Sequence, residues 1–419
     1  MRFSFLILFV FIFSAHSWSR NYSADDLFDV FSSSIYQVKI IDVESGSQSS
    51  IGSGFVVLDG YSFATNYHVI SSLVHQPAQY RAEILRNGVA IELVIDTFDI
   101  VHDLAVLVPK DQEFLGQPLV LSSEPINKGK PLFSIGNPHD IGMTVVEGTY
   151  NGLVEHQFID LIHFSGSINP GMSGGPVINT AGHVVGINVA TSGDQIGFLV
   201  PVQALQYLLE RRVMNRGKDF MALIQEQVGA FTDNVIDDFL ASSWQLAPMG
   251  DVEVLGALSS RMECWGDTDK DEEGQIDRIS KGCSNNDTIY IERGFNTGTI
   301  AYEFEYQRAY DWHTSTFYQT MTNNLFGVGP GNRANEDGVD NYQCKISVVH
   351  DPQQNMAKKV NYCVRPYTNI KGLFDAFYLA ASIDKKDRML IEHYTLSGIT
   401  QSSASRFLNR FIGGAAAWQ

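Results

Sequence analysis

The fold of the first half of this chain is decided by the stretch NPGMSGGPV at residues 169–177. It places one serine, Ser173, inside a glycine-rich turn between two segments that are typical of strands. Glycine lets the backbone bend sharply and approach another molecule closely, so the amides of Gly171 and Ser173 can point at one position in space. Two converging amides form an oxyanion hole, which makes Ser173 a candidate nucleophile. Such a serine also needs an imidazole to take its proton and a carboxylate to orient that imidazole.

His68 and Asp103 are the candidate base and acid. His68 lies just past the end of a predicted strand at residues 62–66, and Asp103 stands at the head of a predicted apolar strand. An imidazole with its ordinary pKa of about 6.5 can accept a proton at neutral pH. His102 adjoins Asp103, but neighbouring side chains on a strand point to opposite faces, so we reject it as the base. The order His, Asp, Ser is that of the two-barrel proteases of the chymotrypsin class.

Six segments in one order resemble the trypsin-like serine proteases of the HtrA (high-temperature requirement) type. They are residues 65–69, 103–107, 134–138, 169–177, 182–188 and 196–201. The resemblance covers roughly residues 30–210. It implies a mainly β fold, with two six-stranded antiparallel barrels and an active site in the cleft between them.

The same resemblance assigns roles to individual residues. It implies that His68 is the general base, Asp103 the orienting acid and Ser173 the nucleophile, with the amides of Gly171 and Ser173 as the oxyanion hole. Met172 replaces a residue that is usually polar in this family. Because that position contributes mainly backbone, we expect catalysis to survive. The strand that would bind the substrate backbone comprises Ile187, Asn188, Val189 and Ala190.

Composition and the N-terminus bear on partners and location. The chain has 419 residues and a net charge of −18, which argues against nucleic acid or an anionic membrane as partner. Arg2 precedes an apolar run at residues 3–13, too short to span a bilayer, and small residues follow at Ala15 and Ser17. This pattern predicts a signal peptide over residues 1–17, with an uncleaved anchor as the alternative. We therefore expect a secreted or periplasmic protein with no membrane span after signal removal.

All four cysteines lie in the second half of the chain, in two pairs with equal spacing. In an exported chain an even number of cysteines favours disulfides over a metal site. Three connectivities are open, and the preferred one joins cysteines that are close in sequence. This preferred connectivity pairs Cys264 with Cys283 and Cys344 with Cys363.

The second half of the chain has no assigned family. We expect a protease domain over residues 22–212, a helical linker over 213–244 and a disulfide-stapled, mainly β domain over 245–419. The last expectation comes from alternating apolar and polar runs. HtrA-type chains commonly continue into PDZ domains, but no short Gly-Leu-Gly-type turn that would open such a domain is recognised here.

One acidic loop is a weak candidate for a calcium site. Acidic residues at alternate positions suit a hard cation, and here they are Asp267, Asp269 and Asp271. Measured as an EF-hand loop, however, the segment has Glu272 at the sixth position and Arg278 at the twelfth. A solvated acidic loop is therefore the preferred interpretation.

Two functions remain open at this stage. The first is an exported serine endopeptidase that hydrolyses peptide bonds in proteins or peptides through His68, Asp103 and Ser173, a chemistry that needs no cofactor. The second is a silent or latent protease-fold scaffold whose C-terminal domain binds a protein partner. Retention of all three side chains and of the glycine turn favours the endopeptidase.

Overall fold

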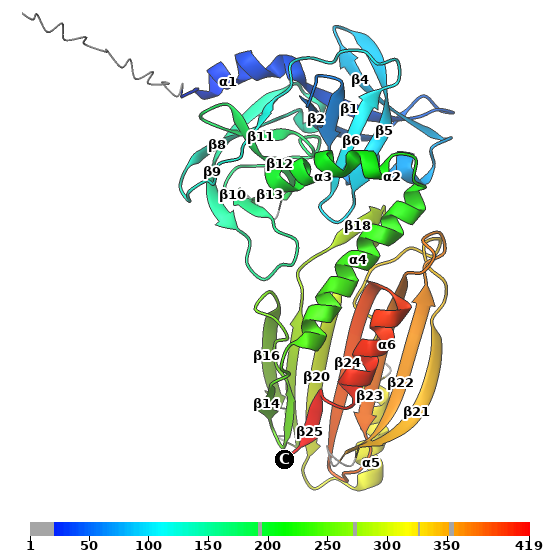
Figure 1. Cartoon of the computed structure of the whole chain (residues 1–419). Helices are drawn as coiled ribbons and strands as arrows, with labels where there is room; N and C mark the ends of the chain where they lie inside the picture. Colours follow the sequence, from blue (N-terminus) through cyan, green and yellow to red (C-terminus); the bar gives the residue numbers. More distant parts are fainter. Residues whose placement is uncertain (1–20, 192–194, 271–274, 326, 352–355) are drawn as a thin grey trace, which may run out of the picture.

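The computed structural model of this chain describes residues 21–191, 195–270, 275–325, 327–351 and 356–419. The predicted signal peptide lies outside these residues. Figure 1 shows two barrels at one end of the molecule and a large β-sheet at the other, with helix α4 running from one to the other. The predicted mainly β fold is confirmed, including both barrels, the helical region and the β-rich C-terminal domain.

The first barrel is closed and six-stranded, in the order β1-β2-β3-β6-β5-β4. Helix α1 (Ala24–Phe31) and a short 3₁₀ turn (Ser32–Ser34) precede it, and helix α2 (Tyr67–His75) follows β3. Every neighbouring strand pair is antiparallel. The strands are β1 (Ile35–Asp42), β2 (Gln48–Val57), β3 (Ser62–Thr65), β4 (Tyr80–Arg86), β5 (Val89–Asp99) and β6 (Leu104–Pro109).

The second barrel also has six antiparallel strands and closes through the pairing of β11 with β12. A short extra strand, β7 (Val120–Leu121), adds parallel to β12. A 3₁₀ turn (Pro138–Asp140) follows β8, and helix α3 (Val202–Asn215) leaves the barrel after β13. The barrel strands are β8 (Pro131–Gly136), β9 (Thr144–Leu153), β10 (Ile162–Phe164), β11 (Pro176–Asn179), β12 (His183–Thr191) and β13 (Gly197–Pro201).

The C-terminal domain is built on a seven-stranded antiparallel sheet in the order β16-β17-β20-β24-β23-β22-β21. Helices α4 (Phe220–Ala241) and α6 (Gln401–Ile412) cover one face (Figure 1). Helix α5 (Thr314–Leu325) packs on residues of the opposite face. The strands are β16 (Glu263–Lys270), β17 (Ile276–Ser284), β20 (Ile300–Ala309), β21 (Gln343–Asp351), β22 (Met356–Pro366), β23 (Phe374–Ser382) and β24 (Arg388–Ile399).

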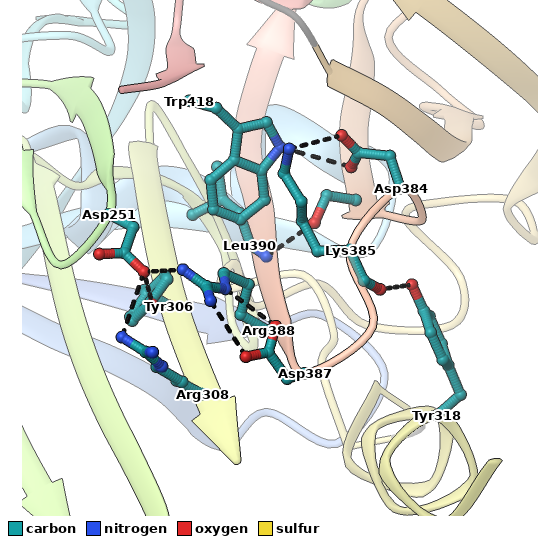
Figure 2. Close-up of polar contacts among 11 residues, drawn as sticks. Asp251, Tyr306, Arg308, Tyr318, Asp384, Lys385, Asp387, Arg388, Leu390 and Trp418 are labelled. Carbon is teal, nitrogen blue, oxygen red and sulfur yellow. Dashed lines mark hydrogen bonds and ion pairs between the residues drawn. The ribbon is translucent and has the colours of Figure 1, made fainter. Parts of the chain in front are cut away.

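Two smaller sheets complete this domain. One contains β14 (Leu246–Met249), β15 (Val252–Leu255) and the C-terminal strand β25 (Ala416–Trp418). Figure 2 shows the contacts of Trp418, the last residue of β25, whose indole N–H donates a hydrogen bond to the Asp384 carboxylate at 3.3 Å. The other is the hairpin of β18 (Ile289–Glu292) and β19 (Phe295–Thr297), which lies at the barrel end of the domain (Figure 1).

Both predicted disulfides are confirmed, with the preferred connectivity. Cys264 and Cys283 face each other across β16 and β17, and Cys344 and Cys363 face each other across β21 and β22. Strands β16 and β21 are the two edges of the large sheet. Each edge strand is therefore covalently tied to its inner neighbour, which protects the part of a sheet that is most open to fraying and mispairing.

Candidate active site

His68 is positioned by the start of helix α2. Strand β3 ends at Thr65, Asn66 is extended (φ −85°, ψ 153°), and the helix begins at Tyr67. The Tyr67 amide and the Asn66 side chain both donate to the backbone carbonyl of Asp103, at 3.2 and 2.8 Å. The first turn of the helix is thus fastened to the loop that carries the candidate acid. The sequence indicated only a strand end here and did not reveal the helix.

Asp103 holds His68 through both of its carboxylate oxygens. Oδ2 lies 2.6 Å from Nδ1 of the imidazole, and Oδ1 accepts the His68 backbone amide at 2.8 Å. Asp103 has a left-handed backbone (φ 53°) in the turn before β6, a conformation that is uncommon for residues other than glycine. A carboxylate at Nδ1 favours the tautomer that carries its proton there, which leaves Nε2 free to accept one.

The same pair sets the pKa of His68. Burial of the imidazole acts to lower this pKa, while the Asp103 charge and hydrogen bond act to raise it. The two contributions of Asp103 outweigh burial, and the pKa of His68 is raised above its usual value. An imidazole in this setting is a stronger base, and it is stabilised once it has taken a proton.

The turn that carries Ser173 is hydrogen-bonded to a strand of the first barrel. The Ser53 hydroxyl donates to the Gly171 carbonyl at 2.7 Å, and the Ser53 amide donates to the Ser173 carbonyl at 2.8 Å. Gly171 has φ +97°, and a Cβ there would lie 2.4 Å from the Asn137 carbonyl oxygen, so the turn requires glycine. Met172, whose position is usually polar in the family, is completely buried in an apolar cluster of the second barrel.

The amides of Gly171 and Ser173 donate to no protein acceptor within the described residues. The Ser173 hydroxyl donates to the Val189 carbonyl at 3.2 Å, and no hydrogen bond joins it to His68 in this part of the chain. Catalytic hydrogen bonds are often long or misaligned before substrate binds, so this contact is compatible with a resting site.

The predicted substrate strand lies in β12, directly beside Ser173. The Ile187 side chain is completely buried in an apolar cluster, and the Asn188 side chain is also completely buried. Asn188 accepts from the Ser134 hydroxyl at 2.9 Å and donates to the Met172 carbonyl at 3.2 Å. These two side chains therefore belong to the barrel interior. Val189 is half-buried, and Ala190 contributes its backbone to the pairing with β13.

Two other predictions concern a rejected histidine and a metal. His102 binds a different acid, since its Nδ1 lies 2.8 Å from Oδ2 of Asp99. The acidic segment proposed for calcium is largely strand β16, where the Asp269 carboxylate lies 3.9 Å from the Arg278 guanidinium. Asp271 lies outside the described residues. In the described parts of the chain, no three His, Cys, Asp or Glu side chains are grouped so that they could hold a metal ion.

The C-terminal domain also reaches this site, a contact that no sequence pattern indicated. The Tyr290 ring lies edge-on to the His68 imidazole, with 6.2 Å between the ring centroids and 77° between the ring planes. The alternating run around Tyr290 indicated a strand but not its neighbour. A cavity of about 80 Å³ close by is lined from both barrels and from the C-terminal segment, including Asp103, Val189 and Thr288.

Comparisons with known proteins identify the N-terminal region. Residues 52–187 match the trypsin-like peptidase domain family. HhoB of Synechocystis, named as a serine protease, is 30% identical over 181 residues, which are 41% of this chain and 42% of HhoB. Human serine protease HTRA3 is 28% identical over 208 residues, which are 46% of this chain and 45% of HTRA3. The chain thus spans less than half the length of these curated relatives.

A solved structure with a related sequence is the crystal structure of Deg5. It is 29% identical, covers 45% of this chain and 92% of its own, and superposes with a TM-score of 0.39. Within the described residues, no helix has the length and apolar character needed to cross a membrane.

Proposed function

We propose that this chain, whose N-terminal half is an HtrA-type trypsin-like peptidase domain, is an exported serine endopeptidase. His68 is the general base, Asp103 orients it, and Ser173 is the nucleophile. The substrates are proteins or peptides, and no cofactor takes part. The observation that carries the proposal is the two-point attachment of His68 to Asp103, beside a glycine turn in which two amides have no acceptor among the described residues.

The reaction follows from these positions. Nε2 of His68 takes the Ser173 proton as the hydroxyl oxygen attacks a peptide carbonyl carbon, and the resulting oxyanion accepts hydrogen bonds from the amides of Gly171 and Ser173. His68 then gives its proton to the leaving amine, which leaves an acyl group on Ser173. A water molecule, activated by the same imidazole, releases the acyl group as a carboxylic acid and restores the serine.

Substrate backbone would pair with β12 next to Ser173, beyond Ile187, where the described pairing of β12 with β11 ends. The Val189 carbonyl that holds the Ser173 hydroxyl marks the start of this stretch. Because the Ile187 backbone is paired on both sides and both backbone polar groups of Asn188 bond to the turn around Ser173, we assign substrate pairing to Val189 and Ala190. The roles of Ile187 and Asn188 are to shape the strand and to hold the nucleophile turn.

Export is proposed from two separate features. The apolar run at residues 3–13 has the length of a signal-peptide core. The two disulfides persist in oxidising compartments such as the periplasm or the extracellular space. We accordingly place the enzyme in one of these compartments after removal of residues 1–17.

A second candidate is a latent protease that a partner of the C-terminal domain switches on. It is favoured by one contact, the hydrogen bond from Ser173 to the Val189 carbonyl in place of one to His68. In that case the purified protein would be inactive until the partner was added.

The test compares digestion of dye-labelled casein by the wild type, Ser173→Ala and Ser167→Ala. Ser167 is an exposed serine in the same loop and serves as the matched control. We expect Ser173→Ala to lose about 10⁴-fold or more in kcat and Ser167→Ala to match the wild type, because the three catalytic groups act as a unit. Digestion by Ser173→Ala at the wild-type rate would refute the assignment.

A further inference from the structure

Strand β18 of the C-terminal domain is attached to the helix that carries His68 (Figure 1). The Ile291 carbonyl accepts two hydrogen bonds, one from the Tyr67 hydroxyl at 3.0 Å and one from Nε2 of His75 at 3.2 Å. Tyr67 and His75 are the first and last residues of α2. Both ends of the helix are therefore anchored to β18, and His68 lies between the two anchors.

Apolar packing makes this attachment extensive. Ile289 and Ile291 are at most 1% exposed, and they belong to one cluster with core residues of the first barrel. That cluster includes Tyr67, Val69 and Phe98. The core of the barrel thus continues into the C-terminal domain, and separation of the two would expose large apolar side chains to water.

The second barrel is held by the same C-terminal segment. Asp287 is 5% exposed, and its carboxylate accepts the amides of Phe158 and Ile159 at 2.9 and 2.8 Å. These two amides lie in the loop between β9 and β10. A buried carboxylate needs such donors, so the contact is specific as well as close. The segment therefore contacts both barrels that enclose the candidate active site.

Tyr290 is the residue of this segment that reaches the imidazole. Alternation along β18 directs Ile289 and Ile291 into the shared core and leaves Tyr290 on the other side of the strand. Its ring lies edge-on to the His68 imidazole. The Tyr290 side chain is half-buried, and it packs against the shared core cluster.

We propose that Tyr290 is a positioning residue, whose ring holds the His68 imidazole in the rotamer that binds Asp103. The imidazole of His68 has no hydrogen bond to Ser173 in the described residues, and its polar partner there is the Asp103 carboxylate. Side chains exchange among staggered rotamers unless packing prevents it. In this proposal, the edge-on contact with the Tyr290 ring is what keeps the imidazole from turning away. This inference rests on the proposed function of His68 as the base.

The expected effect is on turnover and not on substrate binding. Loss of the ring in Tyr290→Ala lets the imidazole leave its working rotamer, and kcat falls about 10- to 100-fold, since small misplacements of catalytic groups have effects of this size. KM stays within about 2-fold of the wild-type value, because a change made only in the transition state lowers kcat alone. Tyr290→Phe keeps the ring and restores kcat.

Tyr318→Ala is the matched control. Tyr318 is also a half-buried tyrosine of the C-terminal domain, and its hydroxyl donates to the Lys385 carbonyl at 2.6 Å. Figure 2 shows it among the contacts around Trp418, and Figure 1 places its helix, α5, at the end of the domain away from the barrels. Its removal weakens the same domain without contact to α2, so kcat should remain that of the wild type.

A second measurement does not depend on turnover. In a Ser173→Ala background, NMR of histidine-labelled protein follows the proton on Nδ1 of His68. We expect a protected resonance that Tyr290→Phe retains and Tyr290→Ala loses through exchange with water, whereas Tyr318→Ala leaves it unchanged.

The outcomes separate this inference from the proposed function. An unchanged kcat and an unchanged Nδ1 resonance in Tyr290→Ala would overturn the positioning role. A raised KM with an unchanged kcat would overturn it as well, since Tyr290 would then contact substrate. If the wild type showed no turnover, the proposed function would fail, and the resonance would still decide whether Tyr290 holds the imidazole.

Discussion

The substitution Ile291→Ala measures how strongly the C-terminal domain is joined to the first barrel. Ile291 is completely buried in the apolar cluster that extends from barrel to hairpin. Truncation of a buried isoleucine to alanine lowers the free energy of unfolding by about 2–5 kcal/mol, through lost transfer energy and the cavity left behind. Ile346 is 64% exposed on β21, and Ile346→Ala should change that free energy by less than about 0.5 kcal/mol.

Two probes report the two halves of the protein separately. Four of the five tryptophans lie in the C-terminal half, at positions 244, 265, 312 and 418, and Trp18 directly follows the predicted signal peptide. In a Trp18→Phe background, fluorescence during urea unfolding therefore follows the C-terminal half. Hydrogen exchange measured on peptides from α2 follows the first barrel. We expect Ile291→Ala to shift the fluorescence transition to lower urea concentration and to increase the rate of hydrogen exchange in α2. The loss of free energy calculated from exchange should match the loss calculated from urea unfolding.

The joint shift is the test of a shared core. If Ile291→Ala moved the fluorescence transition and left exchange in α2 unchanged, the two domains would unfold independently. Strand β18 would then not stabilise the helix that carries His68, even though Ile291 is buried. Equal shifts in Ile346→Ala would indicate a general effect of truncation and refute the argument in the same way.

Three further predictions concern the site and the sheet. Activity should fall as pH drops through the raised pKa of His68, a midpoint above about 6.5, because the protonated imidazole cannot act as the base; a midpoint below this value in kcat/KM profiles would contradict the pairing with Asp103. Asp103→Asn should lower the pH midpoint of kcat/KM and should also lower kcat by about 10⁴-fold. Both quantities come from steady-state kinetics measured across a range of pH. Replacing Cys264 and Cys283 together by serine should lower the free energy of unfolding, measured by urea titration, by about 3 kcal/mol. The reason is that the disulfide closes a loop with a sequence separation of 19. An unchanged urea midpoint would show that the disulfide does not stabilise the edge strand.

The barrels and the contact between His68 and Asp103 were predictable because the signals are local and occur together. The glycine turn around Ser173, the strand end before His68 and the apolar run after Asp103 each have a short sequence pattern. One of these alone decides little, whereas their order points to one fold. The disulfide pairing was predictable for a similar reason, because equal and short spacings suit two hairpins.

The connection between the domains was not predictable, because its partners are far apart in the chain. Tyr67 and Ile291 are 224 positions apart, and nothing near either residue identifies the other. Alternation around Tyr290 indicated a strand, but strand pattern does not determine which surface a strand covers. Helix α4 illustrates the same limit. Its periodicity predicted a helical linker, while in the structure Ile236 and Phe239 are buried in the core of the C-terminal sheet.

The central claim is that Ser173 is an activated nucleophile beside a formed oxyanion hole. It is tested most directly by treating the purified full-length protein with a fluorophosphonate and locating the adduct by peptide mass spectrometry. We expect one adduct on Ser173 in the wild type, and strongly reduced labelling of this serine in His68→Ala. An absence of adduct in the wild type, or labelling of Ser173 that proceeds equally fast without His68, would contradict it.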